Sequence, residues 1–428
     1  MPKIKAFRGI RYNPEKVSIE NVLCPPYDVI TPKQSEEYHK KDPHNAIGLV
    51  LGRQLLSDSK KDNRYTRARD IWNKWRQVCI LKQDSIPAIY YHKQGYRIGD
   101  KTYTRTGFIS IVHIDEEGGK NILPHENTHK GPKLDRLHLM KETKANLSCI
   151  FGIYSDPAKV VSSQIKPYLK EPEIDITTEE GYQKLWVIDD SEIIKKVSNV
   201  MVDKTIFIAD GHHRYETAKA YRDRKRISTR KKDGDQPFDY VMMYLSNIDD
   251  GITVLPTHRV IIDSMGTGLV ELEYKIKEVF NMIPFDNRAA LLNALNEKGK
   301  GHLGLFVKGI PRYYMLKLIN EEFIERFMPE DTPSLLKKLD VTILHKCILE
   351  PILGIDRVLT STCVSYISDS EQTLDMVEKG QADIAFLLNP PSIQEIVKIA
   401  KAGLRVPQKS TFFYPKIPTG LVFYSLEG

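Results

Sequence analysis

One segment, Ile206–Ala218, constrains the fold of this chain most, because in it a strand must pass almost directly into a helix. It reads I-F-I-A-D-G-H-H-R-Y-E-T-A. The apolar run that ends at Ala209 is typical of a buried strand, and the residues from Arg214 onward favour a helix. Gly211 permits a turn geometry that other residues resist and lets the backbone approach a ligand closely. The segment predicts a strand–turn–helix joint within a layered fold of strands and helices.

The start of this helix is suited to an anion. A helix N-terminus presents free backbone N–H groups and the positive end of the helix dipole. Arg214 and the imidazoles of His212 and His213 add side-chain donors. Asp210 ends the strand, where open α/β sheets place catalytic and metal-binding groups. The alternative is an ordinary turn in which Asp210 caps the helix and the histidines lie on the surface.

Apolar periodicity along the rest of the chain predicts strands that alternate with helices. Strands are expected at 45–51, 87–92, 104–114, 185–189, 205–209, 240–246, 254–262, 304–307, 313–318 and 384–388. Helices are expected at 65–77, 214–224, 269–279, 289–295, 334–349, 370–379 and 392–401. Such alternation predicts an α/β or α+β fold. The pattern changes after residue 262, which predicts an N-terminal region, 1–262, and a C-terminal α/β domain, 263–428.

A polar stretch at 115–133 interrupts this pattern and predicts a long loop, a kind of segment that is often functional. It contains His125-Glu126-x-x-His129, which matches the H-E-x-x-H pattern of zinc hydrolases. That pattern needs a helix to place both histidines on one face, and the prolines and glycines around it leave room for barely two turns. The favoured interpretation is a substrate loop with Glu126 as general base. A solvated charged loop is the alternative.

A second rigid feature is the turn L-C-P-P-Y-D-V-I, in which two prolines stiffen the chain before Tyr27 and Asp28. Asp28 is a candidate metal ligand or base, and the alternative is that it caps a helix beginning near Pro32. Further along, the polar insertion Thr257-His258-Arg259 lies in an apolar region. The candidate substrate-binding residues are Tyr27, His125, Lys133, Arg136, His258 and Arg259.

Composition narrows the classes of function. The net charge of +7 is mild and forms no stripe, so nucleic acid is not an expected partner. The five cysteines are scattered without a C-x-x-C pair, which is typical of a reducing compartment. No stretch approaches the roughly 20 apolar residues of a membrane span, and the N-terminus has no signal-peptide pattern. We expect a cytoplasmic protein with a small-molecule partner. It has no Walker or G-x-G-x-x-G motif, so any nucleotide phosphate must be held by another element.

Five motifs together resemble the family known as "domain of unknown function 1015". They are P-P-Y-D-V-I, P-H-E-x-T, A-D-G-H-H-R-Y-E-T-A, L-P-T-H-R and P-Q-K-S-T-x-F-Y-P-K, and they follow one another in that order over almost the whole chain. Five separate motifs in the same order make the resemblance specific, although it implies little about activity.

The D-G-H-H-R element also resembles the phosphate-binding turn of the ParB/sulfiredoxin superfamily, above all that of free-serine kinases. Those enzymes phosphorylate the hydroxyl of free L-serine with ATP or ADP, giving O-phosphoserine for cysteine or siderophore synthesis. The resemblance implies a ParB/sulfiredoxin-like core with long insertions, ATP or ADP as co-substrate and Mg²⁺ as cofactor. It implies that Asp210, Gly211, His212, His213 and Arg214 hold the phosphates and Mg²⁺.

The same resemblance implies an acidic residue upstream of the turn as catalytic base, for which the candidates are Glu126 and Asp28; Asp28 is also the second candidate Mg²⁺ ligand. The compact serine kinases carry that acid much closer in sequence to the turn, so this chain departs from them and needs a long insertion or a rearranged topology. Two other functions stay open: a ParB-like nucleotide-binding regulatory module, and a zinc hydrolase that uses His125 and His129.

Overall fold

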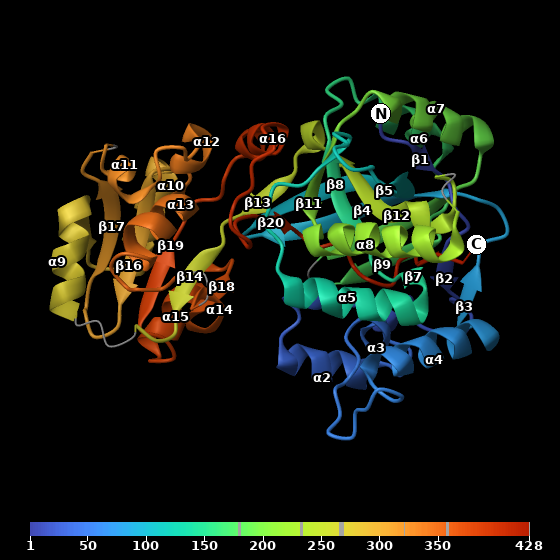
Figure 1. Ribbon diagram of the computed structural model, residues 1–428, viewed down its shortest axis with the longest axis horizontal. Helices are drawn as coiled ribbons and strands as arrows, with labels where there is room; N and C mark the ends of the chain where they lie inside the picture. The colour runs from blue at the N-terminus through green and yellow to red at the C-terminus, as the bar shows by residue number, and fades with distance from the viewer. Residues whose placement is uncertain (179–180, 232–233, 265–268, 321, 357–358, 428) are drawn as a thin grey trace. The chain divides into compact units, whose positions relative to one another are not determined.

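The computed structural model describes the chain except for residues 179–180, 232–233, 265–268, 321, 357–358 and 428. The described chain divides into two compact units (Figure 1). Unit 1 comprises residues 1–124, 128–252 and 415–428, and unit 2 comprises residues 125–127 and 253–414.

Unit 1 is built on a large mixed sheet. Its strands are β1 (Ile4–Lys5), β4 (Ile89–Ile98), β5 (Lys101–His113), β6 (Ile122–Leu123), β8 (Ile150–Tyr154), β9 (Ile174–Thr178), β10 (Gly181–Ile188), β11 (Ile206–Asp210) and β12 (Tyr240–Asn247). In the described part of the chain the order is β6-β11-β8-β12-β5-β4-β10-β9, with β1 beside β5. The pairs β6–β11 and β8–β12 are parallel, whereas β8–β11 and β5–β12 are antiparallel. Two short ladders join β2 (Ile10–Tyr12) to β3 (Leu81–Gln83) and β7 (Ala145–Asn146) to β21 (Tyr424–Ser425).

The helices of unit 1 pack on this sheet and on one another. They are α1 (Ile19–Val22), α2 (Pro32–Lys41), α3 (Ile47–Val50), α4 (Arg64–Gln77), α5 (Lys130–Thr143), α6 (Val160–Ile165), α7 (Ser191–Val202) and α8 (His212–Thr229), with short turns η1 (Tyr27–Val29), η2 (Lys166–Tyr168), η3 (Pro237–Asp239) and η4 (Ile248–Asp250). Figure 1 shows α8 crossing the sheet with α5 beside it. Tyr215 and Ala218 of α8 pack into the main core with Ile208 and Leu245 of the sheet, so the buried face of α8 fixes where its N-terminus lies.

A second core in unit 1 lies between α3, α4 and the returning C-terminal segment. Trp72 and Trp75 of α4 are buried in it together with Phe423. Because Phe423 packs here, residues 415–428 belong to unit 1 although the preceding 160 or so residues form unit 2.

Unit 2 contains an antiparallel sheet covered on both faces. Its strands are β14 (His258–Ile261), β15 (Phe280–Phe285), β16 (His302–Val307), β17 (Tyr313–Leu318), β18 (Val364–Ile367) and β19 (Ile384–Leu387), and a separate pair is β13 (Thr253–Leu255) with β20 (Phe412–Tyr414). The order among the residues described is β15-β17-β16-β19-β14-β18. The helices are α9 (Leu269–Val279), α10 (Arg288–Lys298), α11 (Phe323–Phe327), α12 (Ser334–Lys337), α13 (Asp340–Leu344), α14 (Thr360–Cys363), α15 (Ser370–Glu378) and α16 (Ile393–Lys401), with a π-helical turn η5 (His345–Leu349).

Alternation along β16 explains the two covered faces of this sheet. Leu303, Leu305 and Val307 pack into one core with α9 and η5, and Phe306 packs into another with α10 and α15. Residues of opposite parity on a strand point to opposite faces, so both faces need apolar cover. Within the described ranges, no helix combines the length and apolar character needed to cross a membrane.

The fold class predicted from the sequence is confirmed: the chain is a mixed α/β structure. Most predicted elements are present within a few residues of their expected bounds. The predicted strand at 45–51 is wrong, because residues Ile47–Val50 form α3. The side-chain oxygen of Asn45 accepts a hydrogen bond from the Ile47 backbone N–H at 2.9 Å, and Asn45 Nδ2 donates to the Asn21 carbonyl at 2.6 Å. A short run that is apolar on all sides fits a buried helical turn as well as a strand.

The predicted long loop at 115–133 is also only partly present. Asp115 Oδ2 accepts hydrogen bonds from the backbone N–H groups of Asn121 and Ile122, which folds the segment back so that β6 pairs with β11. Helix α5 begins at Lys130, so the irregular stretch between β6 and α5 is short. The two units divide at residue 252 instead of the expected boundary at 262, because β13 and β14 lie in sheets of unit 2.

Candidate functional site

The joint between β11 and α8 has the form that the sequence predicts. Gly211 is the N-cap of α8 with φ +93°, in the left-handed region that favours glycine, and its carbonyl accepts the N–H of Tyr215. A β-bulge lies just before it: Ile208 pairs with Gly152 and Asp210 with Phe151, which leaves Ala209 as the extra residue. Such a bulge turns the following side chain away from the regular strand direction. The alternative in which Asp210 caps the helix is therefore wrong.

Asp210 lies instead between two cations. Its carboxylate forms ion pairs with Arg214 and with Lys416, and its side chain is 12% exposed. Lys416 belongs to the sequence Y-P-K near the C-terminus, which returns to unit 1. Sequence reasoning missed Lys416, although the polar insertion just before it in an apolar region was a signal. The buried carboxylate thus fixes two positive side chains beside the start of α8.

Arg214 is held from both sides. Its NH1 donates to the carbonyl of Cys149 and its NH2 to Asp210. Burial by itself would lower the pKa of Arg214, but the charges of Asp210 and Asp28 raise it above its ordinary value. The guanidinium is therefore a permanent buried cation at the first turn of α8, with Asp28 close enough to contribute to its field.

The N-termini of α5 and α8 lie side by side. The backbone N–H of His129, the N-cap of α5, donates to His213 Nε2 at 3.0 Å. Further along, Thr217 of α8 donates to the Lys133 carbonyl of α5 at 3.4 Å. The first turns of both helices therefore point their free N–H groups to the same side, and their dipoles add there. This geometry places the Lys133 backbone against Thr217 of α8, and Arg136 lines the same pocket as Arg214. The substrate-binding roles of Lys133 and Arg136 stay predictions.

Arg136 of α5 and Arg214 of α8 line a pocket of unit 1. Its polar lining comes from Arg136, Arg214, Asn146 and Ser148, and its apolar lining from Val50, Leu139, Met140, Ala145, Leu147, Ile150 and Val241. In the described structure, Asn146 Nδ2 has no hydrogen-bond partner. Two buried guanidinium groups and the free amide nitrogen of Asn146 in a mostly apolar pocket suit a ligand with an anionic end and an apolar body.

Tyr27 and Asp28 contribute to the same region. The guanidinium of Arg136 lies 3.9 Å from the centre of the Tyr27 ring, and its NH1 donates to the Val50 carbonyl at 2.8 Å. Burial and the charge of Asp28 raise the pKa of Tyr27 to about 12. Asp28 is exposed. It does not cap α2, because Thr31 is the N-cap and forms a capping box with Gln34.

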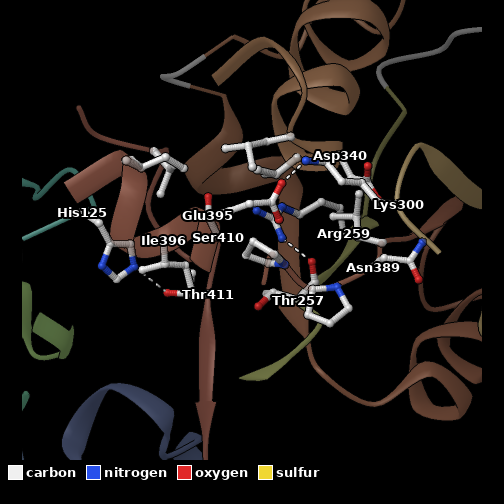
Figure 2. A pocket seen from close by; sticks show the side chains of 17 residues that line it. His125, Thr257, Arg259, Lys300, Asp340, Asn389, Glu395, Ile396, Ser410 and Thr411 are labelled. Atoms are coloured by element: carbon white, nitrogen blue, oxygen red, sulfur yellow. Dashed lines mark hydrogen bonds and ion pairs between the residues drawn. The ribbon is translucent and has the colours of Figure 1, made fainter. Parts of the chain in front are cut away.

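The two remaining residues of the predicted substrate loop belong to unit 2. Glu126 Oε1 accepts hydrogen bonds from the Thr411 backbone N–H at 3.1 Å and its hydroxyl at 2.7 Å. His125 Nε2 lies 3.1 Å from the same hydroxyl (Figure 2). Residues 125–129 are not helical. His125 and His129 therefore lack the shared helix face of a zinc hydrolase, and in the part of the chain described no three His, Cys, Asp or Glu side chains gather as metal ligands would.

His258 and Arg259 also lie in unit 2, on β14. His258 is buried, and both of its ring nitrogens have partners: Nδ1 accepts the Leu388 N–H at 3.0 Å and Nε2 lies 2.8 Å from the Ser370 hydroxyl. Burial and the neighbouring Arg259 lower the pKa of His258 to about 3. The imidazole is therefore neutral and engaged within the sheet. Arg259, by contrast, lines a pocket of unit 2.

We expect Gly211→Ala to disturb this site through Arg214. A Cβ at Gly211 would lie 2.9 Å from Arg214 Nε, and the left-handed backbone adds strain of roughly 1–2 kcal/mol. Gly118→Ala is the matched control, since Gly118 also has a positive φ (+76°) but no described atom lies within 4 Å of its Cβ. Thermal unfolding should show a larger loss for Gly211→Ala, and titration with ATP or ADP should show weaker binding in that variant alone. Equal losses with unchanged nucleotide affinity would contradict the role of the turn.

Comparison with known proteins places the chain in a family. The model of the family described as "Protein of unknown function (DUF1015)" matches residues 4–342. The chain belongs to this family. The match confirms the resemblance on four of the five motifs, and the last motif lies beyond residue 342 in this DUF1015 chain. No curated protein matches it.

Several solved structures show a remote likeness. A free serine kinase in complex with AMP is 13% identical, with 71% of this chain and 86% of that chain covered at a TM-score of 0.37. A conserved hypothetical protein from Pyrococcus furiosus is 14% identical, with 74% and 96% covered at 0.37. SbnI with a C-terminal truncation, from Staphylococcus aureus, is 12% identical, with 73% and 86% covered at 0.35. The ParB/sulfiredoxin-like core stays a prediction.

Proposed function

We propose that this protein is a small-molecule kinase that transfers a phosphoryl group from ATP or ADP to a hydroxyl group, with free L-serine as the first acceptor to test. The observation that carries the proposal is the pairing of the α5 and α8 N-termini in the unit whose pocket is lined by Arg136 and Arg214 of the same two helices. Phosphoryl transfer depends mainly on holding the phosphates in place and neutralising their charge. Backbone N–H groups and guanidinium groups that are fixed in advance do both.

Within this proposal the residues have separate tasks. The first-turn N–H groups of α5 and α8 bind phosphate oxygens, as helix N-termini do in many nucleotide sites. Arg136 is fixed by Tyr27, the Val50 carbonyl and an ion pair with Asp135. In this proposal its remaining N–H groups bind a second oxygen, and the apolar walls of the pocket contact the uncharged part of the nucleotide. Arg214 supplies positive charge from the wall of the site, where its hydrogen bonds to Cys149 and Asp210 hold it.

Mg²⁺ fits this donor set on the side of Asp28. Magnesium in such sites is usually held by one or two carboxylates together with the nucleotide phosphates and water. Asp210 already carries Arg214 and Lys416, whereas Asp28 is exposed and lies in the field of Arg214. Asp28 is therefore the carboxylate open either to a metal ion or to the acceptor hydroxyl, while Asp210 keeps the cations in position. Bound Mg²⁺ would neutralise charge on the transferred phosphate.

Asp28 and Glu126 are the two candidates for the base that orients the acceptor hydroxyl. Asp28 belongs to unit 1 with the phosphate-binding groups. Glu126 belongs to unit 2, and one of its carboxylate oxygens accepts two hydrogen bonds from Thr411. We favour Asp28 as the carboxylate nearest to the reaction and treat Glu126 as the competing candidate. Lys133, in the first turn of α5, is positioned to attract an acceptor carboxylate.

The experiment is a screen of amino acids and small alcohols, L-serine among them, for phosphorylation that depends on ATP or ADP and Mg²⁺, read by mass. The proposal expects one hydroxyl compound to gain a phosphoryl group. Nucleotide binding without transfer to any acceptor would favour the nucleotide-binding regulatory module instead. Absence of both binding and transfer would reject the site.

A further inference from the structure

Arg259 is a buried cation of unit 2 with no anionic partner at ion-pair distance among the described residues. Arg259 of β14 is fully buried; its NH1 donates to the Thr257 carbonyl and its guanidinium lies 4.8 Å from the centre of the Tyr366 ring. Within the described structure, Arg259 Nε and NH2 have no hydrogen-bond partner. The carboxylate of Glu126 contributes only at longer range. A buried charge without a close partner is costly, so sequences rarely place one where nothing binds it.

The surroundings of Arg259 form a pocket with further unused polar atoms (Figure 2). The hydroxyl of Thr257 has no described partner, and neither has Asp340 Oδ2. The other oxygen of Asp340 accepts the Gly301 N–H at 2.8 Å, and Asn389 lies beside the same carboxylate. Oδ2 therefore keeps an unused acceptor position. Lys300 and Glu395 pair with each other and neutralise each other's charge. The pocket is lined throughout by residues of unit 2.

The unused polar atoms of this pocket indicate which chemical groups its ligand carries. A guanidinium with two free N–H positions matches the paired oxygens of a carboxylate or phosphate. The open oxygen of Asp340 accepts a hydrogen bond from a donor such as an ammonium or hydroxyl group. We infer that unit 2 binds a small organic anion in this pocket, with its acidic group on Arg259 and a donor group of the same molecule on Asp340. This inference goes beyond the proposed kinase, because the phosphate-binding groups of that site all belong to unit 1.

The test rests on Arg259→Met in the full chain. If Arg259 serves a ligand, replacing an uncompensated buried charge by an apolar side chain of similar length leaves the melting temperature unchanged or raises it. Binding should nevertheless fall by about 10- to 100-fold, the usual worth of hydrogen bonds to a charged group. Arg326→Met, at an exposed arginine of the same unit, is the matched control and should bind as the wild type does.

Titration calorimetry with acetate, glycine and inorganic phosphate reports the binding. Acetate and phosphate distinguish a carboxylate from a phosphate ligand. Glycine adds an ammonium group, and its advantage over acetate should disappear in Asp340→Asn, whose side-chain oxygen can still accept the Gly301 N–H. Phosphate bound at the unit 1 site is recognised because Arg136→Gln weakens it and Arg259→Met does not, so the two proposals fail independently. The inference is overturned if no probe binds the wild type, or if Arg259→Met lowers the melting temperature and leaves binding intact.

Discussion

Asp28→Asn should lower kcat by about 10²–10⁴, the usual contribution of a positioned acid–base group, while leaving the melting temperature unchanged. Asp28 is exposed, and within the described structure no hydrogen bond or ion pair from its side chain holds the fold together. Its effect must therefore come through the reaction. The measurement is steady-state phosphoryl transfer to the acceptor found in the screen, at several Mg²⁺ concentrations, with thermal unfolding in parallel.

Glu126→Gln is the comparison for this variant. Glutamine keeps a side-chain oxygen that can accept the Thr411 hydrogen bonds, so the fold of this segment should persist while the carboxylate is lost. We expect Glu126→Gln to keep most of its turnover. Normal turnover in Asp28→Asn together with a large loss in Glu126→Gln would reverse the assignment. A loss in Asp28→Asn that high Mg²⁺ restores would make Asp28 a metal ligand instead of the base.

Asp210→Asn should lose both stability and turnover. The neutral amide leaves Arg214 and Lys416 as buried cations without their shared carboxylate, and breaking a buried pair costs about 3–5 kcal/mol. Asp235→Asn is the matched control. Like Asp210, Asp235 pairs with two cations, Lys3 and Lys5, but its side chain is half-exposed. Exposed pairs contribute only about 0–1 kcal/mol each. Chemical denaturation of both variants measures the difference.

The outcome for Asp210→Asn separates two accounts of the turn. An unchanged free energy of unfolding together with full turnover would show that the two ion pairs of Asp210 contribute to neither stability nor the reaction. Loss of turnover with unchanged stability would place the carboxylate on the ligand instead of on its two cations.

The sequence predicted the β11–α8 joint because its signals are local. The strand, the glycine and the helix start follow one another within a few residues, and each has a strong preference of its own. The helix at 65–77 could be predicted equally well, since Trp72 and Trp75 repeat at helical spacing. At Asn45–Val50 the local apolar pattern predicted a strand, but helix α3 forms there. The Asn45 side chain makes hydrogen bonds to residues more than twenty positions away, which the local pattern does not show.

The parts of the site that escaped prediction depend on long-range folding. Lys416 reaches Asp210 across 206 positions in the chain, and no periodicity links them. The pairing of α5 with α8 rests on His129 and His213, which are separated by 84 positions. The separation of His125 and Glu126 from the rest of the predicted substrate loop depends on contacts with Thr411. Such contacts arise from the tertiary fold, and a single sequence shows only that the polar residues are present.

The central claim is that the paired N-termini of α5 and α8, with Arg136 at their side, bind nucleotide phosphate. The most direct test is calorimetric titration of the full chain with ATP and with ADP in the presence of Mg²⁺, repeated on Arg136→Gln and on the surface control Arg97→Gln. The account predicts saturable binding at one site per chain, weakened by about 10- to 100-fold in Arg136→Gln and unchanged in Arg97→Gln. No binding of either nucleotide, or equal binding by all three proteins, would contradict it.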